Sequence, residues 1–62
     1  MENEIWYAGE KCRLINVFDE EKEKNWCNDA QNFIDVSRKE GKKACCIHEG
    51  NKHGLYIQIN ER

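Results

Sequence analysis

The chain has 62 residues, a formal net charge of −2 and no proline, and 35% of its residues are charged. This length corresponds to one domain, residues 1–62, which buries only about 60% of the surface that the unfolded chain exposes. So small a core leaves little room for the deep, supported cleft that catalysis requires. We therefore expect a binding protein and not an enzyme, and we expect no cofactor.

The expected location is the cytoplasm. The acidic N-terminus is not followed by the apolar segment of a secretory signal, and no apolar run reaches the roughly 18 residues of a membrane span. In a reducing compartment cysteines stay free and pack as small apolar side chains, and we expect this of Cys12, Cys27, Cys45 and Cys46. The abundance of Asn, Lys, Glu and Ile is typical of AT-rich coding sequences, such as those of low-GC bacteria and their phages.

Two strands are predicted before the acidic segment 19–23. Residues 5–8 are aromatic and β-branched, and residues 11–18 form a longer apolar run. Regular alternation in the second strand places one set of side chains on one face, namely Cys12, Leu14 and Phe18. Ile15 and Val17 then lie on the other face, so this strand is apolar on both sides.

A helix is predicted to end near Glu40. Apolar and small side chains recur at helical spacing on one face, namely Trp26, Ala30, Phe33, Ile34 and Ser37. Arg38 and Lys39 suit the negative end of the helix dipole, and Gly41 suits the position after the last helical residue. The start is expected near residue 20 or near residue 28, where Asn28 and Gln31 match a capping box.

Residues 43–48 and 55–59 are predicted strands on either side of a glycine-bounded turn, residues 49–54. In the last strand Leu55, Ile57 and Ile59 share one face, and Tyr56 and Gln58 share the other. The order is therefore ββαββ. It predicts a small antiparallel sheet of two hairpins in an α+β fold, with one helix packed on one face. The alternative is a small SH3-like barrel, formed if the first two strands curl around.

One helix covers only one face of a sheet, so apolar residues of the second face need another cover. Either the sheet closes on itself, or these residues form a partner or dimer surface. Our main hypothesis is a small regulator or inhibitor, phage- or prophage-encoded, that docks onto a protein partner. The predicted anchors, which would also give a weak homodimer, are Trp6, Ile15, Val17 and Tyr56.

The alternative function is nucleic-acid binding. Residues 1–35 carry four basic and nine acidic side chains, whereas residues 36–62 carry six basic and three acidic ones. The predicted phosphate contacts are Arg38, Lys39, Lys42, Lys43 and Lys52, with Tyr56 available for stacking on a base. Dedicated nucleic-acid binders are usually basic overall, and this chain is acidic, so the protein partner ranks first.

Metal binding and nucleophilic catalysis are weaker readings of the same sequence. Cys12, Cys27, Cys45, Cys46, His48 and His53 are suitable ligand types, but no pair has the C-x₂-C spacing of a structural zinc site. Cys46 and His48 share one face of a strand, and Glu49 follows as an orienting carboxylate. No phosphate-binding glycine motif or oxyanion site accompanies them. We expect neither a metal nor a catalytic residue.

Overall fold

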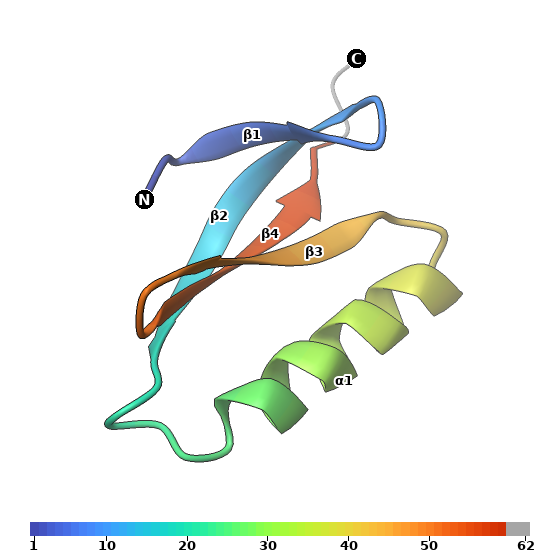
Figure 1. The fold of residues 1–62 in the computed structure, drawn as a ribbon. Helices are drawn as coiled ribbons and strands as arrows, with labels where there is room; N and C mark the ends of the chain where they lie inside the picture. The colour runs from blue at the N-terminus through green and yellow to red at the C-terminus, as the bar shows by residue number, and fades with distance from the viewer. Residues whose placement is uncertain (60–62) are drawn as a thin grey trace.

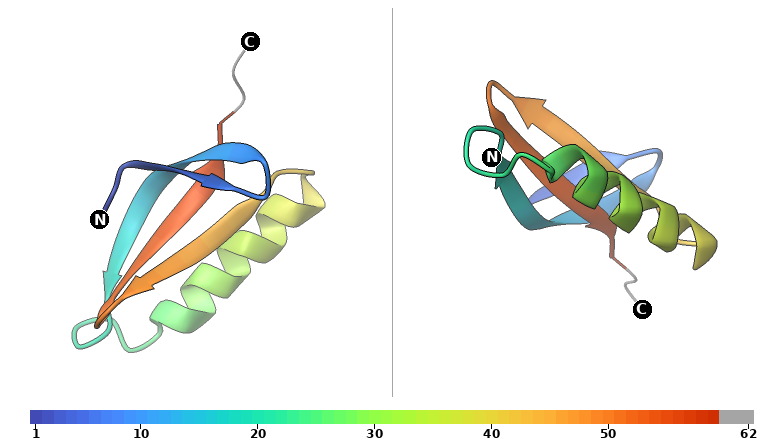
Figure 2. Two further views of the ribbon diagram at one scale, coloured as in Figure 1. Left: turned by 45° about the horizontal axis from the view of Figure 1, so that its top comes forward. Right: turned by 90° about the horizontal axis from the view of Figure 1, so that it is seen from below.

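The computed structural model describes residues 1–59 as one antiparallel sheet with a single helix on one of its faces (Figure 1). The elements are β1 (Glu4–Tyr7), β2 (Glu10–Asp19), α1 (Trp26–Lys39), β3 (Ala44–Glu49) and β4 (Lys52–Gln58). The strands follow the order β1-β2-β4-β3, and neighbouring strands are antiparallel. The predicted ββαββ order with one packed helix is confirmed. The sheet curls into a half-barrel, because β1 bends away from the other strands on the side opposite α1 (Figure 2).

A β-bulge in β2 decides which side chains face the helix. Leu14 and Asn16 pair with consecutive residues of β4, so Ile15 between them has no partner. One extra residue shifts the alternation of the strand by one position. As a result Val17 lies on the same face as Leu14, and Phe18 points to the opposite face. The predicted placement of Val17 and Phe18 was therefore wrong, because it assumed a regular strand.

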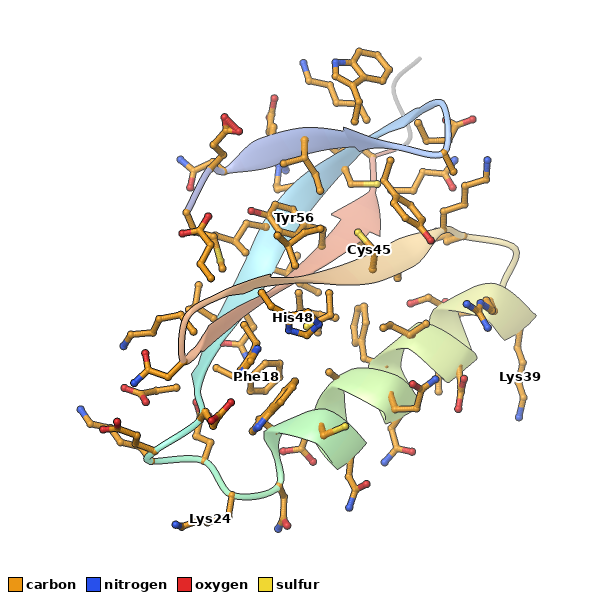
Figure 3. All side chains as sticks on the ribbon, in the orientation of Figure 1. Phe18, Lys24, Lys39, Cys45, His48 and Tyr56 are labelled. Atoms are coloured by element: carbon orange, nitrogen blue, oxygen red, sulfur yellow. The ribbon has the colours of Figure 1, made fainter. Side chains whose placement is uncertain are left out.

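The bulge allows β2 to contribute to two small cores, one on each face of the sheet. The first core lies on the side of β1 and consists of Cys12, Cys45 and Tyr56, with Ile5 and Leu14 packed against them. The second lies between the sheet and α1 and consists of Phe18, Ala30 and Leu55, flanked by Trp26, Phe33, Ile34 and Cys46. Figure 3 shows Tyr56 and Cys45 on one side of β3 and Phe18 on the other.

The N-terminal segment covers the first core. The hydroxyl group of Tyr56 donates a hydrogen bond of 2.6 Å to the carbonyl oxygen of Glu2. Met1 lies directly over Gly54, where an added Cβ would collide with its sulfur. Gly54 therefore makes room for Met1, and the half-barrel is closed at this position by chain that precedes β1.

Helix α1 starts at Trp26, between the two predicted positions, and buries the predicted face. Ala30 and Ser37 are buried, and the larger side chains of the stripe are half-buried. The predicted capping box does not form, because Asn28 lies inside the helix and the side chain of Gln31 donates to Asp35 instead.

The C-terminal end of α1 agrees with the prediction. Gly41 has a φ of 81°, which places it in the left-handed region that favours glycine. The N–H of Gly41 donates to the carbonyl of Arg38, and the N–H of Lys42 donates to that of Ser37. This is the hydrogen-bond pattern of a Schellman motif. It directs the chain sharply from the helix into β3.

The turn between β3 and β4 is shorter than predicted. Only Gly50 and Asn51 lie between the two strands, so the predicted turn at residues 49–54 was wrong. The physical reason is the φ of 59° at Gly50, since a positive φ at the first central residue allows a tight two-residue hairpin. The longer β4 brings His53 opposite His48.

Candidate functional site

A row of exposed apolar side chains crosses the sheet face that α1 does not cover. Val17 of β2 and Ile47 of β3 both lie opposite Gly54 of the central strand β4. Their exposed fractions are 41% and 36%. Met1 is also exposed and fills the space above Gly54. We refer to Met1, Val17 and Ile47 as the open-face strip.

The four predicted anchor residues do not form one surface. Val17 belongs to the open-face strip, and Ile15 is exposed at the unpaired bulge position of β2. Trp6 is 73% exposed, but it lies on the face of β1 opposite Ile5, away from the first core. Tyr56 is 1% exposed and belongs to that core, so it contributes nothing to the exposed surface. The alternation of residues along β2 did not predict this arrangement, because no local sequence pattern marks the bulge or the N-terminal segment that covers Tyr56.

Charged side chains border the open-face strip on the adjacent row of the sheet. Asp19 and Glu49 flank Lys52 in register. Lys52 Nζ lies 2.9 Å from Asp19 Oδ2, and this hydrogen bond, with one from the N–H of Glu21, lowers the pKa of Asp19. Glu49 forms no ion pair within residues 1–59. This border therefore carries one unpaired negative charge.

The predicted basic cluster separates into two places. Lys52 lies at the far end of the sheet, bound to Asp19. Three other cations line one hollow beside the C-terminal end of α1, namely Arg38, Lys42 and Lys43. Lys39 lies in the last turn of the helix but does not line this hollow. Tyr7 does line it, a residue that the sequence did not identify as part of a site.

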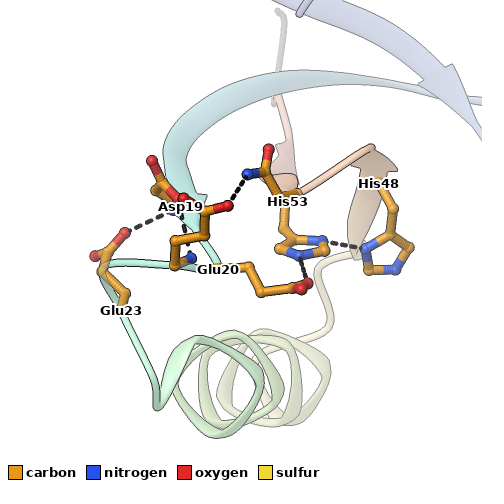
Figure 4. A network of polar contacts seen from close by, with 7 residues as sticks. Asp19, Glu20, Glu23, His48 and His53 are labelled. Carbon is orange, nitrogen blue, oxygen red and sulfur yellow. Dashed lines mark hydrogen bonds and ion pairs between the residues drawn. The ribbon is translucent and has the colours of Figure 1, made fainter.

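A chain of polar contacts connects the loop before α1 with both strands of the second hairpin (Figure 4). His53 is 4% exposed, and its Nε2 lies 2.8 Å from Glu20 Oε1. Its Nδ1 lies 2.6 Å from Nδ1 of His48. Trp26 stacks on the His53 ring with a centroid distance of 3.6 Å and an interplanar angle of 5°. These contacts fix the start of α1 against the sheet.

The arrangement of protons in this chain follows from the acceptors. A carboxylate only accepts, so His53 Nε2 carries a proton and donates the hydrogen bond to Glu20. One proton lies between the two Nδ1 atoms, because a nitrogen pair at 2.6 Å needs one donor and one acceptor. A carboxylate–imidazole–imidazole chain of this kind can hold and pass a proton. Within residues 1–59, none of its hydrogen-bond or ring contacts includes a cysteine or hydroxyl nucleophile, so we assign it a structural role.

The cysteines are free thiols in this structure, and three of them are shielded. Burial raises the pKa of Cys45 to about 11, and burial likewise raises the pKa of Cys12 and of Cys46. A thiol must lose its proton to act as a nucleophile or a metal ligand. Cys27 is the exposed one. The shielded thiols are thus suited to packing, with Cys45 and Cys46 on opposite faces of β3.

Within residues 1–59, no group of three or more His, Cys, Asp or Glu side chains is arranged to hold a metal ion. In the same part of the chain, no helix is long and apolar enough to cross a membrane.

Comparison with known proteins gives no match. No family model fits the chain, and no curated protein or solved structure shows significant similarity to it. The side chains described above are therefore the basis for inferring a function.

Proposed function

We propose that this protein is a small binding protein of the regulator or inhibitor type, which docks onto a protein partner through the open-face strip. The observation that carries this proposal is the exposure of Val17 and Ile47 in one row with Met1 on the face opposite α1. Apolar side chains grouped on a surface and bordered by charge are typical of protein–protein interfaces.

The size of the strip favours a different protein over a second copy of the chain. Complete burial of one aliphatic side chain contributes roughly 1.5–3 kcal/mol. Side chains already more than half covered contribute less than half of this, so the six that two copies would bury supply about 4–7 kcal/mol. Association costs at least about 4 kcal/mol in lost freedom. A homodimer through this strip alone would therefore be only marginally stable. A partner with a larger apolar surface would bury more area and so exceed the cost of association.

The charge border indicates the character of that partner. Glu49 beside the strip is not neutralised within the described residues, and Glu2 is exposed next to Met1. A partner with lysine or arginine around an apolar centre would complement both carboxylates. Such complementarity mainly accelerates and orients docking. The apolar contacts would supply most of the affinity.

The test has two stages and uses a double variant, Val17→Glu with Ile47→Glu. Proteins retained by the tagged parent from a lysate of the source cells are identified, and the candidate is purified and titrated by calorimetry. We expect the parent to bind it and the double variant to lose at least tenfold in affinity. Loss of two buried apolar contacts and burial of two charges accounts for a change of this order.

Val36→Glu is the matched control, because Val36 is an exposed valine on α1 and lies outside the strip. It should bind the purified partner like the parent. Circular dichroism should show that all variants are folded. If the double variant binds as tightly as the parent, or if the control loses as much affinity, the strip is not the docking surface. If the double variant is unfolded, its two side chains belong to the core and the proposal is wrong.

A further inference from the structure

A hollow of about 370 Å³ lies at the other end of the molecule from the open-face strip. Tyr7 and Ala8 of the first hairpin form one wall, and the chain from the end of α1 to the start of β3 forms the other. Its volume falls within the roughly 300–1,000 Å³ of pockets that hold small ligands. The cationic side chains on its lining are Arg38, Lys42 and Lys43, and no carboxylate of residues 1–59 lines it.

Hydrogen bonds of the backbone fix these three cations in place. The Schellman motif at Gly41 sets the positions of Arg38 and Lys42 on either side of the turn. Lys43 is held to β4, because its N–H donates to the side-chain oxygen of Gln58 and its carbonyl accepts from the N–H of that residue. Hydrogen bonds of the fold therefore hold the backbone of these three residues at the hollow, and no flexible loop is needed to bring them together.

The first hairpin is attached to the same place. The ammonium group of Lys43 donates a hydrogen bond of 2.8 Å to the carbonyl oxygen of Ala8. Ala8 has a φ of 52°, a left-handed conformation that is unfavourable for a residue with a Cβ. Ala8 and Gly9, whose φ is 81°, together form the two-residue turn of the first hairpin, for which a positive φ at both positions is usual. The contact positions Tyr7, which is exposed at the rim of the hollow.

An ordinary role of cations at a helix C-terminus is to offset the helix dipole, which amounts to about half a negative charge. Three full charges exceed that requirement. Three of the last four carbonyls of α1, those of Val36, Ser37 and Arg38, also already accept N–H groups from the turn. Within residues 1–59, none of the three cations forms an ion pair. The hollow thus retains positive charge for an external anion.

We propose that this hollow binds a phosphate group linked through a sugar to a planar aromatic ring, the chemistry of a nucleotide. Arg38 and Lys42 contact the phosphate oxygens, with Lys43 holding the wall and adding its charge. Tyr7 provides the aromatic surface on which the ring stacks. The ligand is either a free nucleotide or one nucleotide of a single strand. This site is separate from the open-face strip and does not depend on the function proposed for it.

The test is an NMR titration of the ¹⁵N-labelled protein at low salt with four probes. They are AMP, ribose 5-phosphate, adenosine and a short single-stranded oligothymidylate. We expect AMP to shift the amide signals of Ala8, Gly41 and Lys42. Ribose 5-phosphate lacks the aromatic base and adenosine lacks the phosphate. Each should therefore bind at least about fivefold more weakly than AMP. Tighter binding of the oligothymidylate than of AMP identifies a single strand as the source, and the reverse identifies a free nucleotide.

Single substitutions assign the roles. Lys42→Gln should weaken AMP binding about fivefold or more, as expected for one charge-assisted contact. Tyr7→Leu should weaken AMP similarly but leave ribose 5-phosphate unchanged. Lys39→Gln is the matched control, with the same loss of charge at the residue next to Arg38 but outside the lining of the hollow. It should bind AMP like the parent.

Four results would overturn the proposal. The first is that neither AMP nor the oligothymidylate shifts the signals of the three amides. The second and third are that ribose 5-phosphate, or adenosine, binds as tightly as AMP. The fourth is that Lys39→Gln weakens AMP binding as much as Lys42→Gln does. The last would indicate a diffuse positive field instead of a site. The spectra themselves show whether each variant is folded.

Discussion

Replacement of His53 by phenylalanine separates two explanations for the stability of the second core. The ring of His53 is buried and stacks flat on Trp26, and it also forms polar contacts with Glu20 and His48. Phenylalanine has a ring of similar shape and keeps the stack, but it removes both polar contacts. Alanine removes the stack and the contacts together. Comparison of the two variants therefore measures the ring and the polar chain separately.

The expected magnitudes follow from the exposure of the partners. The carboxylate of Glu20 and the His48 ring are exposed, so water replaces the lost contacts. We expect His53→Phe to lower the free energy of unfolding by about 0–1.5 kcal/mol. His53→Ala should lower it by about 2–4 kcal/mol, because it loses the aromatic pair and leaves a cavity under α1. In a domain of this size, each 1 kcal/mol corresponds to a shift of about 4–8 °C in Tm.

The assay is urea denaturation of the parent and both variants at neutral pH, followed by circular dichroism and by tryptophan fluorescence. Trp26 reports on the stack, and a Trp6→Phe background removes the signal of the exposed tryptophan. If His53→Phe destabilises the protein as much as His53→Ala, the polar chain and not the ring stack stabilises this part of the fold. That result would refute the reasoning above.

Three further predictions concern the first core. Gly54→Ala should cost about 1–3 kcal/mol of stability, because its Cβ would lie only 3.1 Å from Leu14 and 3.2 Å from Tyr56 while the exposed Met1 can move aside; a melt identical to that of the parent would contradict the close approach. Tyr56→Phe should cost about 1 kcal/mol and speed up amide exchange in the N-terminal segment, because the bond to Glu2 is lost; unchanged exchange would argue against this bond. The pKa of Cys45 is raised from 9.0 to about 11, so its neutral thiol is favoured by folding and its contribution is complete below pH 9. Stability should fall as the pH rises from about 9 to 11, and the fall should be smaller in Cys45→Ala; equal slopes in denaturation experiments would contradict this.

The elements with strong local signals were predictable from the sequence. The end of α1 is an example, because Arg38, Lys39 and Gly41 each have a physical preference for the position that they occupy. The apolar stripe of the helix also determined which of its sides is buried. The opposite orientations of Cys45 and Cys46 followed from strand geometry alone. In each case the cause lies within a few residues of the effect.

Features that depend on distant parts of the chain were not predictable. The bulge at Ile15 reflects a fit between β2 and β4, and it places Val17 and Phe18 on faces that strict alternation does not give them. The burial of Tyr56 depends on Glu2, fifty-four residues earlier in the chain. Tyr7 joins the basic hollow only because Lys43 binds the carbonyl of Ala8. Residue types alone do not predict which distant segments of the chain will contact each other.

Hydrogen exchange of the complex with the purified partner tests the proposed docking surface most directly. We predict slower exchange in residues 15–19 and 45–49 and in the N-terminal segment, which form and surround the open-face strip. The outer face of α1 around Val36 should exchange as in the free protein. Protection confined to α1 or to the hollow at residues 41–44, with the strip unchanged, would contradict the proposed function.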